Sequence, residues 1–164
     1  MRSNRLANRP SGRAGELVES LGLEPHPEGG WYREVWRAPA EHGRAASTHI
    51  HFLLAAGEIS RWHRVADADE IWHFYEGGPL ALEMVSRDLV TRRSIVLGPL
   101  EGGHRRYDVV ERGWWQAARP LGGWALVGCT VAPGFELGGF EMLDADRERA
   151  SALVGAWPEA AGWL

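Results

Sequence analysis

The chain has 164 residues, the size of a single domain with one substantial core. Its formal net charge of −4 provides no general basic field for phosphate backbones, so nucleic acid is not an expected partner. No apolar run approaches the roughly 20 residues that a membrane span needs, and the single cysteine, Cys129, fits a reducing compartment. We therefore expect a cytoplasmic globular domain without membrane association.

The first predicted element is a short helix. Residues 1–13 are polar and basic, which favours a flexible arm, and a single domain is expected over residues 14–164. The segment Ala14–Leu23 places apolar residues at helical spacing and carries a glycine near its end. A short amphipathic helix is predicted there.

The middle of the chain predicts strands. Trp31–Trp36 follows a proline- and glycine-rich turn and alternates in polarity. Seven further segments have strand character or end at glycine or proline turns: 47–55, the hairpin 60–78, 80–86, 92–98, 106–111, 114–119 and 124–132. Many short strands at near-regular spacing predict an antiparallel sandwich or barrel. A C-terminal helix is expected to begin after a cap at Asp144 or Asp146 and to end before Pro158.

The hairpin at residues 60–78 carries the strongest candidate site. Its strands bring His63 and Glu70 onto one wall, where they could meet a common ligand. An imidazole can abstract a proton near neutral pH when a carboxylate orients it, so His63 is a candidate base and Glu70 its orienting partner. The alternative is that the two side chains only satisfy each other in a polar pocket.

This hairpin resembles the first motif of the cupin superfamily, G-x(5)-H-x-H-x(3,4)-E-x(6)-G. Gly57, His63, Glu70 and Gly77 stand in register, and Val65 occupies the place of the second histidine. The stretch VVERGWWQAARP, which corresponds to the second motif, has Gln116 where the family has a histidine.

The resemblance implies a metal site of which only two ligands, His63 and Glu70, are retained, with Gln116 as a substitute. His49 and His51, two residues apart on one strand face, could form a further metal pair, or could be half-buried and bound to water. The expected cofactor is therefore either none or a weakly bound divalent metal.

A narrower resemblance extends from Leu17 to about Pro158. HPEGGWYREVWR, EIWHFYEGGPLAL, VLGPLEGG and ALVGCTVAPGFELGGFEM are similar to a small cupin subfamily of bacteria and fungi. Members form dimeric jelly rolls and have been compared with dTDP-sugar epimerases and germins. The resemblance implies an all-β double-stranded β-helix with short N- and C-terminal helices, assembled as a homodimer.

The resemblance also favours His73 as a functional position. In a regular strand, however, His73 lies on the opposite face from Glu70, so it could line the same pocket only if a bulge rotates the strand. Otherwise it belongs to a subunit interface.

Five further residues are candidates for substrate contact: Tyr32, Arg33, Glu34, Trp115 and Gln116. The first three follow the glycine pair of HPEGG and could instead belong to a strand at the dimer interface. Trp115 could supply a stacking wall, and Gln116 an amide that binds a carbonyl group.

Three functions remain open at this point. The first is isomerase- or epimerase-like proton transfer on a small polar carbonyl compound, such as a sugar derivative, with His63 as the base. The second is a metal-dependent cupin enzyme, and the third is a non-catalytic protein that binds a small ligand. A nucleotide-sugar substrate would need positive charge, for which Arg33, Arg61 and Arg64 are the candidates.

Overall fold

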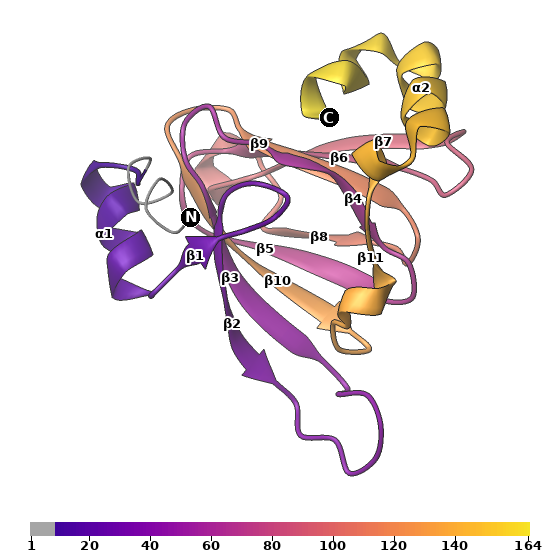
Figure 1. Cartoon of the computed structure of the whole chain (residues 1–164). Helices are drawn as coiled ribbons and strands as arrows, with labels where there is room; N and C mark the ends of the chain where they lie inside the picture. The colour runs from indigo at the N-terminus through magenta and orange to yellow at the C-terminus, as the bar shows by residue number, and fades with distance from the viewer. Residues whose placement is uncertain (1–8) are drawn as a thin grey trace, which may run out of the picture.

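A computed structural model describes residues 9–164 and shows two stacked antiparallel sheets (Figure 1), so the all-β jelly-roll prediction is confirmed. In spatial order, the six-stranded sheet contains β1 (Glu24–Pro25), β2 (Trp31–Arg37), β3 (Thr48–Leu54), β10 (Ala125–Ala132), β5 (Asp69–Gly77) and β8 (Tyr107–Val110). The five-stranded sheet contains β11 (Phe140–Met142), β4 (Ser60–Val65), β9 (Trp115–Pro120), β6 (Leu80–Val85) and β7 (Arg92–Leu97).

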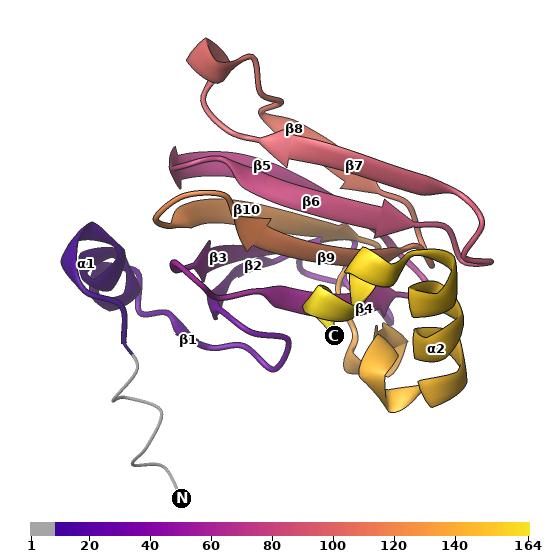
Figure 2. The same ribbon diagram turned by 90° about the horizontal axis from the view of Figure 1, so that it is seen from above.

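Two helices lie on opposite sides of the sheets (Figures 1 and 2): α1 (Gly12–Ser20) and α2 (Arg147–Ala156). The predicted arm, residues 1–13, lies mostly outside the described residues, and its last two residues belong to α1. The Asp146 side chain caps α2 by accepting a hydrogen bond from the Arg149 backbone N–H at 3.1 Å. Asp146 was one of the two predicted caps. Short 3₁₀ turns are found at Leu100–Gly102, Leu137–Gly139, Leu143–Ala145 and Pro158–Trp163.

Alternation along the strands builds the core between the sheets. On β5, Glu70, Trp72 and Phe74 pair with inward residues of β10 and are buried, while the residues between them are more exposed. The predicted strands agree with the observed ones to within one or two residues at most ends. The predicted hairpin over residues 60–78 is wrong, because its two strands, β4 and β5, belong to different sheets and do not pair, so His63 and Glu70 do not share one wall. Two strands were not predicted, β1 and β11, because two or three residues are too short to show a period.

The outer faces of the two sheets differ. The α1 helix packs Leu17 and Val18 against one end of the six-stranded sheet, whereas α2 and the last 3₁₀ turn cover the five-stranded sheet through a tryptophan-rich cluster. The rest of the outer face of the six-stranded sheet is open, with Trp36 55%, Tyr75 43% and Tyr107 63% exposed. Within residues 9–164, no helix is long and apolar enough to cross a membrane.

Candidate functional site

Five buried polar side chains meet between the two sheets: Glu28, Ser60, His63, Glu70 and Gln116, here called the chamber network. Ser60 and His63 come from β4, Gln116 from the adjacent β9, and Glu70 from β5 of the opposite sheet. Glu28 comes from the loop between β1 and β2. All five residues are at most 7% exposed. Their protonation states therefore depend on burial and on the hydrogen bonds they make with one another.

The hydrogen bonds of His63 fix its tautomer. Nδ1 lies 2.7 Å from the Arg61 carbonyl oxygen, which can only accept, so Nδ1 carries the hydrogen. The other ring nitrogen, Nε2, lies 3.1 Å from Glu28 Oε2. Because the Arg61 carbonyl orients the ring, Glu70 does not have the orienting role expected from the sequence.

Burial shifts the titratable groups of the chamber network towards their neutral forms. It lowers the pKa of His63, against the partly opposing charge of Glu70, and it raises the pKa of Glu28 to about 8. It also raises the pKa of Glu70, and the nearby Cys129 thiol has a pKa well above its ordinary value for the same reason. The site therefore combines an imidazole biased towards its neutral form with two carboxyl groups whose pKa values are raised.

Glu70 belongs to a second chain of bonds in the chamber network. Its Oε2 accepts from the Gln116 amide nitrogen at 2.5 Å, and Gln116 Oε1 accepts from the Trp72 indole N–H at 2.7 Å. Since an indole N–H can only donate, Trp72 fixes the orientation of the Gln116 amide. Gln116 is thus held as a donor towards Glu70.

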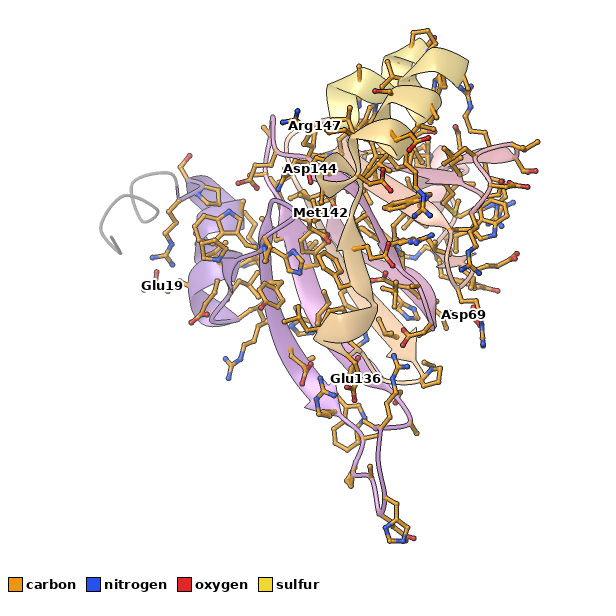
Figure 3. The ribbon with its side chains drawn as sticks, turned by 45° about the vertical axis from the view of Figure 1, so that its right-hand side comes forward. Glu19, Asp69, Glu136, Met142, Asp144 and Arg147 are labelled. Carbon is orange, nitrogen blue, oxygen red and sulfur yellow. The ribbon has the colours of Figure 1, made fainter. Side chains whose placement is uncertain are left out.

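Aromatic rings cover the chamber network on one side. His63 packs against Phe140 of β11 with ring centroids 5.5 Å apart, and His26 contacts both Tyr32 and Phe140 at 4.3 and 6.1 Å. Figure 3 shows the covering segment rising from Glu136 past Met142 to Asp144. Burial lowers the pKa of His26 to about 3, so this covering ring is neutral.

Comparison with known proteins identifies the family. The model of the family described as "Cupin superfamily (DUF985)" matches residues 15–143. The chain belongs to the cupin superfamily. No curated protein matches this cupin.

Solved structures agree with this assignment. A protein from Shewanella oneidensis is 34% identical with a TM-score of 0.78, and the match covers 91% of this cupin and 92% of that chain. A hypothetical protein from Leishmania major is 29% identical with a TM-score of 0.77, covering 93% and 97%. The capsular polysaccharide assembling protein CapF of Staphylococcus aureus is 10% identical with a TM-score of 0.59, covering 73% and 31%, and shares the fold alone.

The residues of this cupin do not fit the metal site that its fold family implies. In the described part of the chain, no three His, Cys, Asp or Glu side chains are arranged to hold a metal ion. Val65, at the place of the second histidine, packs with Ala68 and Val131. Both ring nitrogens of His63 already have protein partners, and Gln116 is held between Glu70 and Trp72.

Three histidines that were candidates for the site lie on the outer face of the six-stranded sheet, away from the chamber network. His49, His51 and His73 are on the outer face of β3 and β5, so they cannot complete a ligand set with His63 inside the barrel. His49 Nδ1 lies 2.8 Å from Thr130 Oγ1 and its Nε2 lies 2.9 Å from Tyr75 Oη, while His73 Nε2 lies 3.1 Å from Thr130 Oγ1. No bulge separates Glu70 from His73, so regular alternation holds there.

The substrate-contact candidates separate in the same way. Tyr32 faces inward beside His26, and Gln116 is central to the chamber network. Arg33 points outward and donates to the Leu21 carbonyl oxygen at 3.3 Å, while Glu34 is exposed and pairs with Arg37 at 2.9 Å. Trp115 does not line the chamber, because it points into the cluster under α2, where Arg64 lies 4.6 Å from its ring centroid.

Sequence reasoning missed Glu28, Ser60 and His26. A signal was present in HPEGG, where a carboxylate precedes two glycines and so stands where the backbone can turn tightly. The contact of Glu28 with His63 spans 35 positions of sequence, and no local period reports such a pairing.

Proposed function

We propose that this cupin is an enzyme that transfers a proton on a small polar carbonyl compound, with His63 as the general base. The supporting observation is the buried imidazole whose hydrogen is held on Nδ1 by the Arg61 carbonyl, so that Nε2, which faces Glu28, has a lone pair and no hydrogen of its own. A hydrogen on the carbon next to a carbonyl group is the proton such a base can remove. The reaction class is isomerase- or epimerase-like, and a sugar derivative is the expected substrate.

The arginines favour a substrate without a diphosphate. Arg61 pairs with Asp144 at 2.5 Å and Arg64 pairs with Glu141 at 2.7 Å. Arg33 bonds a backbone carbonyl on the outer face. Since these guanidinium groups are bound elsewhere, an uncharged sugar or a short hydroxy carbonyl compound fits better than a nucleotide sugar.

A non-catalytic binding protein is the second candidate. It is favoured by the closure of the chamber network, in which Glu28, Ser60, His63, Glu70 and Gln116 all have protein partners and aromatic rings cover one side. In a protein that only binds its ligand, these hydrogen bonds would hold the site in shape and none of the five groups would take up or release a proton.

Carbon–hydrogen exchange in deuterium oxide tests the proposal. Wild-type protein is incubated with dihydroxyacetone, D-fructose and D-glucuronate, and proton NMR follows loss of the hydrogen beside the carbonyl. His63→Asn can keep the bond to the Arg61 carbonyl, so we expect a folded variant with exchange slowed by roughly 10²-fold or more. Glu70→Gln should cost less. Exchange that is indifferent to His63→Asn would refute the mechanism, and binding without exchange would support the second candidate.

A further inference from the structure

The chamber network contains a carboxyl group to which the mechanism above assigns no role. Glu28 Oε2 lies 3.1 Å from His63 Nε2, and Glu28 Oε1 accepts a hydrogen bond from the Ser60 hydroxyl at 2.6 Å. Both oxygens of this buried side chain are therefore placed by β4, and one of them faces the nitrogen that acts as the base.

The facing atoms require a proton between them. His63 Nε2 has only a lone pair in the tautomer that Arg61 imposes, and an ionised carboxylate has only lone pairs, so the two would repel at 3.1 Å. One proton on either atom turns this repulsion into a hydrogen bond. We propose that Glu28 is the acid partner of His63, sharing this proton with Nε2 and delivering it to the oxygen of an α-hydroxy carbonyl substrate. This proposal rests on the proposed function.

His63 and Glu28 together can carry out every proton transfer of an aldose–ketose isomerisation. His63 Nε2 takes the hydrogen from the carbon next to the carbonyl, the C–H electron pair forms the C=C bond, and the Glu28 proton moves to the carbonyl oxygen. The products are an enediol, an imidazolium and a carboxylate. The imidazolium then protonates the neighbouring carbon, and the carboxylate accepts the proton of the other enediol hydroxyl. An aldose and a ketose are thus interconverted, and the pair returns to its first state.

The loop that carries Glu28 is built to press against β4. The Glu28 carbonyl oxygen accepts from the Arg61 N–H at 2.9 Å. Gly29 has φ 114°, and a Cβ there would lie 2.0 Å from the Ile59 carbonyl oxygen, while a Cβ at Gly30 would lie 2.8 Å from the Leu53 carbonyl oxygen. Any side chain at these two positions would lift the loop and withdraw Glu28 from His63.

The groups around the pair determine where its proton resides. Against the effect of burial, Arg61 of β4 lowers the pKa of Glu28, and Glu70 of β5 raises that of His63. His26 of the same loop lies 3.6 Å from Glu28 Oε2, and its own pKa is lowered by burial and by His63, while the pKa of Cys129 of β10 is raised by burial and in part by Glu28. Burial raises the pKa of Glu28 to about 8 and lowers that of His63, so the proton resides on the carboxyl group at neutral pH. In this state Nε2 carries no proton of its own, and its lone pair is released to the substrate carbon when Glu28 turns its proton to the substrate oxygen.

Three variants test the pair. Glu28→Gln keeps the shape and can still donate to Nε2, but its amide releases no proton. Ser60→Ala removes the hydroxyl that positions Glu28. Glu83→Gln is the matched control, because Glu83 lies on β6 and bonds the Ser94 hydroxyl away from the chamber network. Each variant is assayed for exchange with the three probes above and for the pH titration of the His63 Nε2 resonance in ¹⁵N-histidine-labelled protein without ligand.

We expect Glu28→Gln to slow exchange by roughly 10²-fold or more and to abolish an alkaline step in the Nε2 titration, where the shared proton leaves. Ser60→Ala should move that step to higher pH, because the lost hydroxyl favoured the carboxylate. Glu83→Gln should match the wild type. Wild-type exchange in Glu28→Gln, or an unchanged alkaline step, would overturn the role of Glu28 while leaving His63 as the base. Absence of exchange in the wild type would refute the proposed function and the acid role, whereas the titration would still report the shared proton.

Discussion

The buried carboxyl of Glu28 should make the stability of this cupin fall as the pH rises, and Glu28→Gln should remove that fall. The pKa of Glu28 is about 8 in the folded state, against 4.5 for an ordinary glutamate. Between these values the folded chain holds a proton that the unfolded chain has released. Raising the pH within this window therefore favours unfolding.

The magnitude follows from the width of the window. Each pH unit in which one extra proton is held changes the free energy of unfolding by about 1.4 kcal/mol, so the part of the window from pH 6 to 8 corresponds to roughly 2–3 kcal/mol. Burial lowers the pKa of His26 to about 3 and also lowers the pKa of His63, so both rings are biased towards their neutral forms in the folded state. The difference between wild type and Glu28→Gln therefore reports the Glu28 proton together with its coupling to these neighbours.

Urea denaturation followed by circular dichroism at pH 6, 7 and 8 measures this difference. We expect the stability of Glu28→Gln relative to wild type to increase by roughly 2–3 kcal/mol from pH 6 to 8, while Glu83→Gln runs parallel to wild type. Parallel curves for Glu28→Gln would show that Glu28 is already ionised at pH 6 and would refute the shared proton.

Three other outcomes are expected. Gly128→Ala should lower the free energy of unfolding by about 1–3 kcal/mol in urea denaturation, because its methyl group would lie 2.4 Å from Tyr75 Oη and 2.7 Å from His49 Cε1; unchanged stability would contradict this packing. The protein should be a homodimer at micromolar concentration by light scattering, since Trp36 and Tyr75 are exposed on an open sheet face, and a purely monomeric sample would exclude it. Protein purified without chelator should hold less than one metal ion per chain and keep its melting temperature in EDTA; one tightly held iron, nickel or zinc per chain would refute this.

Strand alternation predicted which residues of β4 and β5 face the interior, although not that these strands belong to different sheets. His63 and Glu70 both face the interior, but from opposite sheets rather than from one wall, because β4 and β5 do not pair. His73 lies on the opposite face of its strand from Glu70, because period-two geometry holds through β5 in this region. The same rule could have excluded Trp115. It directly precedes Gln116 on β9, and neighbours on a strand cannot both face one pocket.

The rest of the site comes from a loop, which has no period. Glu28 reaches His63 only because Gly29 and Gly30 let the chain pass within contact distance of the backbone of β3 and β4. The orientation and tautomer of His63 also depend on the backbone carbonyl of Arg61, and no pattern of side chains in the sequence reveals this bond. Pairings of this kind depend on tertiary packing rather than on local sequence.

The placement of the tryptophans separates two optical signals. Trp62, Trp115, Trp157 and Trp163 form a cluster behind the five-stranded sheet under α2, whereas the indole of Trp72 lies between the sheets and bonds Gln116. Trp31, Trp36, Trp114 and Trp124 also emit, so the difference between wild type and Trp72→Phe isolates the signal of the indole bonded to Gln116, and the remaining emission includes the cluster under α2. Comparing wild type with Trp72→Phe would therefore distinguish ligand entry from loosening of the C-terminal helix within one titration.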